Sequence, residues 1–122
     1  MQIVGIALGG ALGAVLRYGV TRAFQPLGRD AFPVGTLVAN LTGALALGFL
    51  VTFLVSKTEV PPAVRLGVTA GVLGAYTTFS TFSLETLALL EDGAWQRATL
   101  YVALSVGGGI ALAWLGQSLA RA

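Results

Sequence analysis

Hydrophobic residues occur in four long runs, separated by short segments that carry charge, proline or glycine. The runs cover about residues 3–22, 33–55, 63–90 and 96–119. Each reaches the ~20 residues that an α-helix needs to cross the ~30 Å hydrocarbon core of a bilayer. The pattern therefore predicts an all-α membrane protein in which residues 1–122 form a single domain of four transmembrane helices.

The composition supports membrane insertion and excludes several classes of function. The chain is 56% hydrophobic and 10% charged, with a mean hydropathy of +0.85, whereas a soluble domain carries roughly 25% charged residues. It contains neither His nor Cys, and no phosphate-binding loop, paired-carboxylate or metal-ligand spacing. We therefore expect no catalytic residues and no enzyme activity. The pI near 9.5 rests on a net charge of only +2, so we expect no nucleic-acid partner.

A segment of the third run, residues 71–83, is unlike a lipid-facing helix. It holds two glycines and five hydroxyl side chains, namely Thr77, Thr78, Ser80, Thr81 and Ser83. Gly and Thr weaken a helix, and Ser and Thr offer its backbone competing hydrogen bonds. Irregular backbone at membrane depth is tolerated only where it is buried in protein or lines a wet cavity. We therefore predict a break in the third helix and place the working part of the protein there.

Four further polar residues lie inside the predicted spans: Arg17, Asn40, Glu85 and Tyr101. Because successive helices run in opposite directions, we expect all four at similar shallow depth, on the side opposite the termini. A charge inside a membrane is costly and usually has a partner, so Arg17 and Glu85 are candidates for an ion pair. Snorkelling of Arg17 to the interface is the alternative. Asn40 alternatively makes an interhelical packing bond, and Tyr101 alternatively belongs to an aromatic belt.

Lys and Arg are almost evenly divided between the two sides of the predicted bundle. Three lie on the side of the termini and four on the other: Lys57, Arg65 and Arg121 against Arg17, Arg22, Arg29 and Arg97. Positive charge in short loops normally sets the orientation of a membrane protein. The balance favours a chain that inserts in both orientations and pairs antiparallel; the alternative is that another feature fixes the orientation.

Small residues recur at helical spacing in three of the spans. The first has Gly5, Gly9 and Gly13, the third has Gly67 and Gly71, and the fourth has Gly107, Gly108 and Gly109. Such faces let helix backbones approach closely in lipid. The pattern is consistent with packing inside one subunit and with association between copies.

Three pieces of the sequence resemble the small fluoride channels of the Fluc (CrcB) family, and the resemblance covers essentially the whole chain. They are Gly9-Gly10-Ala11-Leu12-Gly13-Ala14 with Arg17-Tyr18; Phe32-Pro33-Val34-Gly35-Thr36-Leu37 with Asn40 and Gly43; and Gly74 followed by Thr77-Thr78-Phe79-Ser80-Thr81-Phe82-Ser83 and Glu85. The third piece is highly specific, whereas the first alone is weak. The resemblance implies a multi-pass protein of the inner (cytoplasmic) membrane that exports fluoride passively. It also implies an antiparallel, dual-topology homodimer with two pores.

The resemblance further implies which residues form the site. The family's Phe pair falls on Phe79 and Phe82, its pore asparagine on Asn40, and its polar track on Tyr101 and Ser105. Gly109 stands where relatives carry a second hydroxyl, which bears on the length of that track. The complete expected anion pathway is Thr36, Asn40, Phe79, Ser80, Thr81, Phe82, Tyr101 and Ser105, with Arg17 and Glu85 as pore mouth or ion pair. A Na⁺ ion at the dimer centre is expected on the backbone carbonyls of Gly74 and Thr77.

Two other classes of function remain open from the residues alone. One is a small dual-topology four-helix multidrug exporter, a type that relies on an acidic residue in its first span. Residues 3–21 contain no acidic residue. The other is a non-conducting membrane assembly protein. Ion flux measured on purified protein in liposomes separates these two classes from a fluoride channel.

Overall fold

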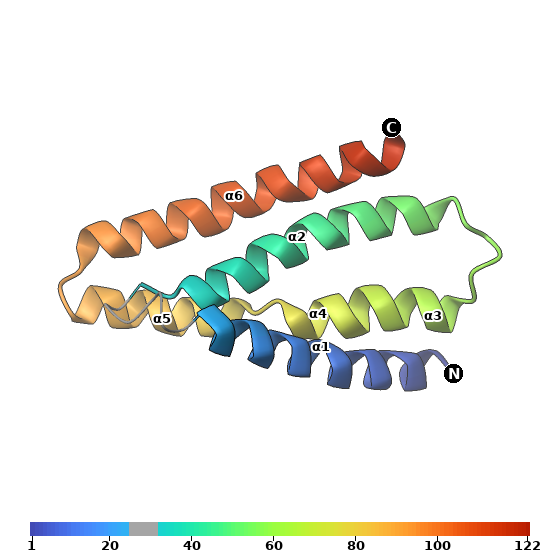
Figure 1. Cartoon of the computed structure of the whole chain (residues 1–122), viewed down its shortest axis with the longest axis horizontal. Helices are drawn as coiled ribbons and strands as arrows, with labels where there is room; N and C mark the ends of the chain where they lie inside the picture. The colour runs from blue at the N-terminus through green and yellow to red at the C-terminus, as the bar shows by residue number, and fades with distance from the viewer. Residues whose placement is uncertain (25–31) are drawn as a thin grey trace.

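The computed structural model describes residues 1–24 and 32–122, and every regular element in that part of the chain is helical. In chain order these are α1 (Gln2–Phe24), α2 (Val34–Val55), α3 (Pro62–Leu66), the π-helix η2 (Gly67–Leu73), α4 (Gly74–Tyr76), α5 (Phe79–Glu91) and α6 (Trp95–Arg121). Figure 1 shows an elongated bundle with both termini towards the same end. α1, α2 and α6 each form one rod, and α3 to α5 follow one another along a fourth.

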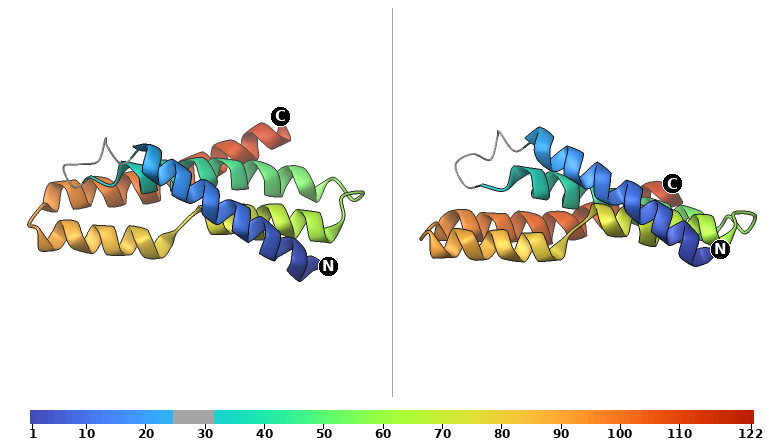
Figure 2. Two further views of the ribbon diagram at one scale, coloured as in Figure 1. Left: turned by 60° about the horizontal axis from the view of Figure 1, so that its bottom comes forward. Right: turned by 90° about the horizontal axis from the view of Figure 1, so that it is seen from below.

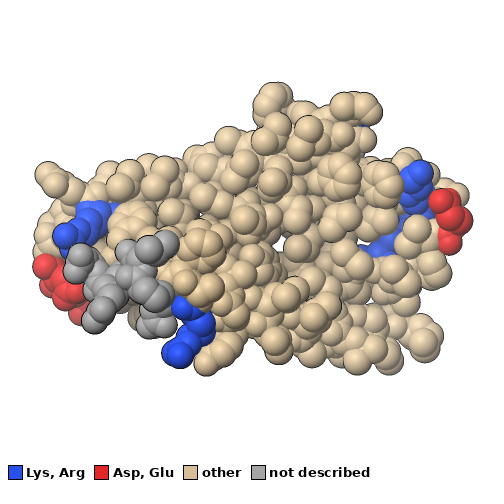
Figure 3. Space-filling model, viewed as in Figure 1, with Lys and Arg blue, Asp and Glu red and all other residues tan. Residues whose placement is uncertain are grey.

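Three of the described helices, α1, α2 and α6, are long and apolar enough to cross a membrane. Figure 3 shows the Lys, Arg, Asp and Glu side chains of one face towards the two ends of the long axis, with uncharged surface between them. This is the distribution expected of a bundle whose middle contacts lipid and whose ends contact water. The molecule is therefore a multi-pass membrane protein. Of the basic residues counted above, Arg29 lies outside the described residues.

The fourth rod departs from α-helical geometry in two places, a π-helical stretch and an extended link. α3 begins at Pro62, where the missing N–H of proline removes no helical bond, and continues directly into η2 and α4. π-Helices are rare in proteins, and many of those that occur lie at functional sites. After Tyr76 the backbone is extended at Thr77 and Thr78, and α5 begins at Phe79. Figure 2 shows this link, with α1 crossing the rod before it and α5 lying along α6 after it.

Glycines of α1 set its contact with the fourth rod. A Cβ atom at Gly9 would fall on the carbonyl oxygen of Gly67, and one at Gly13 would fall on that of Val72. Gly5 meets the carbonyl of Ala63 in the same way. The small-residue face of the first span is therefore used for packing inside the subunit, where two backbones approach closely.

Replacing Gly9 by alanine is expected to lower the melting temperature, because the added methyl meets backbone atoms of η2 that no side-chain rotation can move. Overpacking of this kind costs about 1–3 kcal/mol. Gly10→Ala is the matched control, because a Cβ at Gly10 has no neighbour within 4 Å. Thermal unfolding of both variants in detergent checks the expectation, and equal melting temperatures would contradict it.

The second contact region joins α2, α5 and α6. α5 turns into α6 through Gly93, whose φ of 75° is a left-handed conformation that favours glycine. The turn brings buried side chains of α5 and α6 together, namely Phe82, Leu89, Ala98 and Tyr101. Partly buried side chains at the start of α2, including Phe32 and Leu37, pack against this cluster. One end of the bundle therefore has an apolar core, to which α5, α6 and the start of α2 all contribute side chains.

Candidate functional site

The extended link between α4 and α5 is stabilised by its own threonines. Thr77 has φ −87° and ψ 156°, and Thr78 has φ −150° and ψ 116°. The Thr78 hydroxyl accepts a hydrogen bond of 3.2 Å from the Thr81 amide, so Thr78 caps the N-terminus of α5. An N-cap of this type stabilises a helix by about 1 kcal/mol. α5 therefore starts as a separate helix with its own cap.

Asn40 of α2 binds the backbone of the extended link with both ends of its side-chain amide. Its Nδ2 donates to the Thr78 carbonyl oxygen at 3.0 Å, and its Oδ1 accepts from the Thr78 amide at 2.8 Å. An asparagine amide has two N–H donors, so one of them is left over after these two bonds. Asn40 is thus tied to the link while still lining the cavity described below.

Arg17 of α1 reaches the other side of the same region. Its Nε donates to the carbonyl oxygen of Ala75 at 3.0 Å. Ala75 lies three residues before Thr78, so Arg17 and Asn40 bind the same stretch of the fourth rod. The reason is the path of α1, which crosses the rod beside η2 and α4 (Figure 2).

The expected ion pair between Arg17 and Glu85 is wrong for the described protomer, because the two side chains have different partners. Glu85 Oε1 accepts from the Tyr101 hydroxyl at 2.9 Å, and Oε2 accepts from the Thr36 hydroxyl at 3.1 Å. Glu85 lies on α5, which leaves the side of α1 after the extended link and packs along α6. Position along the helices alone did not reveal this separation.

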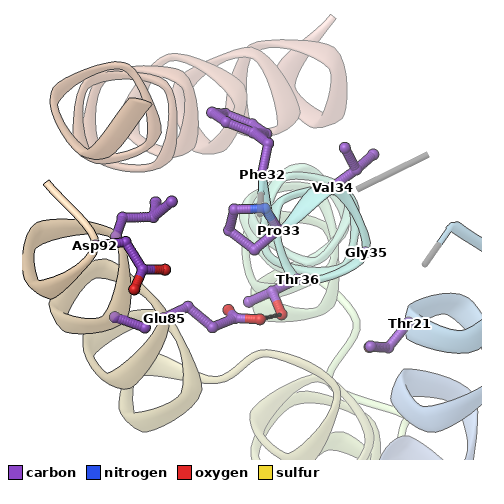
Figure 4. Close-up of a pocket in the computed structure, with 10 residues that line it drawn as sticks. Thr21, Phe32, Pro33, Val34, Gly35, Thr36, Glu85 and Asp92 are labelled. Carbon is purple, nitrogen blue, oxygen red and sulfur yellow. Dashed lines mark hydrogen bonds between the residues drawn. The ribbon is translucent and has the colours of Figure 1, made fainter. Parts of the chain in front are cut away.

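A cavity of about 360 Å³ adjoins the Glu85 carboxylate at the end of the bundle that carries the start of α2. Figure 4 shows Glu85 directed towards Thr36, with the Asp92 carboxylate nearby. Thr36 is 2% exposed and Tyr101 is fully buried, so both hydroxyls are held in place as donors. An anion that reached this cluster would compete with the Glu85 carboxylate for them.

A second cavity, of about 330 Å³, lies beside the extended link. Its lining includes Asn40, Thr77, Thr78, Phe79, Phe82, Ser105 and Gly109. Among the described residues, the Ser105 hydroxyl is buried and has no hydrogen-bond partner. Buried polar groups are nearly always paired, so an unpaired hydroxyl at a cavity wall is a candidate ligand contact. Gly109 places no hydroxyl on the same wall.

The two phenylalanines have different environments. Their ring centroids are 5.8 Å apart at an angle of 48°, but Phe79 is 79% exposed whereas Phe82 is 9% exposed. The Phe82 ring lies 5.1 Å from the ring of Tyr101, whose hydroxyl binds Glu85. Phe82 therefore links the second cavity to the Glu85 cluster, and the positive edge of an aromatic ring can face an anion there.

The remaining expected site residues lie around the link with less direct roles. Ser80 is exposed, and its hydroxyl lies 3.4 Å from that of Thr78. The Thr81 hydroxyl accepts from Thr78 at 3.1 Å. Gly74 is exposed and has ordinary helical angles, and a Cβ there would meet only the Thr69 carbonyl oxygen, at 3.8 Å. The protomer by itself therefore has room for a Cβ at position 74.

Three backbone contacts of the site were not anticipated from the sequence. The amide and carbonyl of Thr78 are the partners of Asn40, and the carbonyl of Ala75 is the partner of Arg17. The Thr78 hydroxyl, three residues before the Thr81 amide, is a recognisable helix-cap signal, but it does not indicate that the Thr78 backbone binds Asn40. Ala75 carries no such signal, because only its carbonyl is used.

Neutralising Arg17 and Glu85 is expected to produce additive losses of stability, since the two side chains have no partner in common. Arg17→Gln, Glu85→Gln and the double variant form the cycle, and the expected coupling is within about 0.5 kcal/mol. Denaturant unfolding in detergent measures each variant. A coupling well above that value would indicate that the two charges meet in the assembled protein.

Apolar helices around two cavities, lined by hydroxyl, amide and aromatic groups, define a small multi-pass membrane protein with a polar region inside its bundle. Residues 4–117 match the family model described as CrcB-like protein, Camphor Resistance (CrcB). The chain belongs to this family, as the sequence motifs indicated.

Curated relatives extend this assignment over the full chain. A protein of Methylococcus capsulatus is 48% identical over 122 residues, covering 99% of this chain and 53% of that protein. A protein of Citrifermentans bemidjiense is 45% identical over 121 residues, covering 99% of this chain and 98% of that protein. A protein of Magnetococcus marinus is 48% identical over 122 residues, with coverage of 99% and 98%. The chain thus spans about half of the first relative and nearly all of the other two. Each of the three is named fluoride-specific ion channel FluC.

Proposed function

We propose that this protein is a fluoride-selective ion channel that lets fluoride leave the cell passively across the cytoplasmic membrane. The observation that carries the proposal is the similarity, at 45–48% identity over 99% of the chain, to proteins named fluoride-specific ion channels. A channel of this kind lowers intracellular fluoride by passive flow of the ion, with no energy source coupled to transport.

The cavity beside the extended link has the chemistry that fluoride conduction requires. Fluoride is small and holds water tightly, so donors must replace its water without trapping the ion. The free Nδ2 hydrogen of Asn40, the unpaired Ser105 hydroxyl and the ring edges of Phe79 and Phe82 are suitable groups. None of them carries a full positive charge, which favours passage over tight binding.

We also propose that α3, η2, α4 and α5 together form the third transmembrane span, with its break at Thr77 and Thr78. None of these elements alone is among the described helices that are long enough to cross a membrane. Extended backbone at membrane depth needs hydrogen-bond partners within the protein. Asn40 supplies such partners to Thr78 within the break, and Arg17 supplies one to Ala75 just before it.

The working assembly in this proposal is an antiparallel homodimer of dual-topology chains. The exposed side of the break supports it, because Phe79 is 79% exposed and Gly74 is exposed as well. The exposed Phe79 side chain lines an ion pathway only if another surface covers it. The 12.5 kDa chain leaves it uncovered, and a second copy of the chain would cover it. The even division of Lys and Arg supports opposite orientations of the two copies.

A Na⁺ ion held by Gly74 and Thr77 carbonyls from both copies is part of the same proposal. In a continuous helix the Gly74 carbonyl would accept from the Thr78 amide and the Thr77 carbonyl from the Thr81 amide. Those amides donate to Asn40 and to the Thr78 hydroxyl instead. Oxygen ligands of this kind suit a hard cation, so the residues present fit the ion. When bound, it would join the two copies electrostatically.

Fluoride efflux from liposomes containing the purified protein tests the function. Rapid efflux that is selective over chloride and independent of a proton gradient supports a channel. Proton-coupled transport of organic cations without fluoride efflux would indicate a multidrug exporter, and no transport would indicate an assembly protein. Either result would overturn the proposed function.

Replacing Gly74 by leucine is expected to abolish dimerisation and leave the helical protomer intact. The protomer has room for the side chain, so a loss arises at the contact with the second copy. Thr77→Val is the matched control, because the proposed ligand at position 77 is a carbonyl and not the hydroxyl. Chemical crosslinking in membranes measures the dimer, and a fully dimeric Gly74→Leu variant would contradict a contact at this point.

A further inference from the structure

The hydrogen bonds around the extended link can be followed group by group. The Thr78 amide, which would donate to the Gly74 carbonyl in a continuous helix, donates to Asn40 Oδ1 at 2.8 Å. The Ala75 carbonyl, which would accept from the first amide of α5, accepts from Arg17 Nε at 3.0 Å. Side chains from α2 and α1 thus hydrogen-bond to backbone groups that would otherwise pair with each other within a continuous third helix.

We propose that Asn40 and Arg17 are positioning residues that hold the third span open, one from α2 and one from α1. Here they are called the brace. The brace acts next to the Gly74 carbonyl in two ways: Asn40 takes the helical donor of that carbonyl, and Arg17 binds the carbonyl of the following residue, Ala75. Its consequence for cation binding rests on the proposed Na⁺ site, whereas its effect on the backbone does not.

The chemistry of each side chain suits this role. An asparagine amide presents a donor and an acceptor side by side, and it meets the amide and carbonyl of the single residue Thr78 as a neighbouring strand would. Aspartate at position 40 could accept from the Thr78 amide but would place a negative charge against the Thr78 carbonyl. Arginine carries five donors and no acceptor, so it can satisfy a carbonyl in an apolar region without needing a return bond.

The brace gives Asn40 a structural role in addition to the expected role of lining the anion pathway. A residue that only coordinates the passing anion would alter flux when replaced, but it would leave the backbone of the third span unchanged. A positioning residue would alter the backbone conformation even in the absence of fluoride. The two roles are therefore separable by a measurement made without any transported ion.

The experiment records the ¹³Cα chemical shifts of Thr77 and Thr78 by NMR on isotopically labelled full-length protein in fluoride-free detergent. Asn40→Leu removes both bonds to Thr78, and Arg17→Met removes the bond to Ala75 while keeping an unbranched side chain. Thr42→Val is the matched control, because Thr42 lies on α2 and contacts Tyr76 but neither end of the extended link. Both shifts are expected to leave the extended range in Asn40→Leu and Arg17→Met, and to remain there in Thr42→Val. Where Asn40→Leu does not fold, Asn40→Ala is measured, because it also removes both bonds to Thr78, and both shifts are again expected to leave the extended range.

A second readout connects the brace to the proposed cation site. The Na⁺ concentration that gives half of the maximal thermal stabilisation is expected to rise about tenfold in either brace variant, as for the loss of one or two hydrogen bonds. Extended-range shifts retained in both brace variants would overturn the proposal. A wild-type protein that is indifferent to Na⁺ would overturn the proposed Na⁺ site alone, since the shifts decide the brace independently. Efflux from liposomes by the wild-type protein decides separately whether the chain is a channel.

Discussion

Replacing Phe79 by isoleucine is expected to lower fluoride flux by about tenfold while the protein remains folded. The Phe79 ring lines the cavity beside the extended link and is 79% exposed in the protomer, so little of the fold depends on it. The substitution keeps most of the volume but removes the positive ring edge that can face an anion. Fluoride efflux from liposomes, measured with a fluoride electrode, gives the rate.

Phe82→Ile is expected to reduce flux as well, with an additional cost in stability. Phe82 is 9% exposed and packs on Tyr101, so an approximately volume-conserving change costs up to about 1.5 kcal/mol. Phe53→Ile is the control for both, because Phe53 stacks on Phe49 away from either cavity. Wild-type efflux from both Phe79→Ile and Phe82→Ile would place the ion pathway elsewhere in the molecule.

Adding positive charge to the loop between α2 and α3 is expected to force one orientation and abolish fluoride resistance. Thr58→Lys and Glu59→Lys are suitable changes because both positions are exposed. The carbonyls of Lys57 and Val60 accept hydrogen bonds from Arg65, so these three residues should be kept. With the original Lys/Arg balance of three against four, two added lysines are enough to dominate the orientation.

Co-expression with an oppositely biased chain is expected to restore resistance. Glu91→Lys and Gln96→Lys make such a chain, because both exposed positions lie at the opposite end of the bundle. Thr58→Gln with Glu59→Gln is the control for changes in loop structure without added positive charge. Because the chain has no cysteine, single cysteines placed in the loops report orientation directly. Labelling of each native loop from one side only would refute the dual topology.

The amino-acid sequence alone determined the class of protein and the position of its main helices. The long apolar runs predict helices where the structure has α1, α2 and α6, because run length and hydropathy are local properties of the chain. The concentration of hydroxyls at residues 71–83 marked the segment that contains the extended Thr77 and Thr78. The family assignment also followed from local motifs and agrees with the relatives.

Only the tertiary structure decided which polar groups meet. Arg17 and Glu85 occupy comparable distances from the ends of their spans, yet Arg17 binds Ala75 whereas Glu85 binds Thr36 and Tyr101. Distance along a helix says nothing of the angle at which helices cross: α1 crosses the fourth rod before the extended link, whereas α5 lies along α6 after the link (Figure 2). The partners of Asn40 and Arg17 are backbone groups, which every residue carries. Their selection therefore depends on how α1, α2 and the fourth rod pack together, and no pattern of residue types could indicate it.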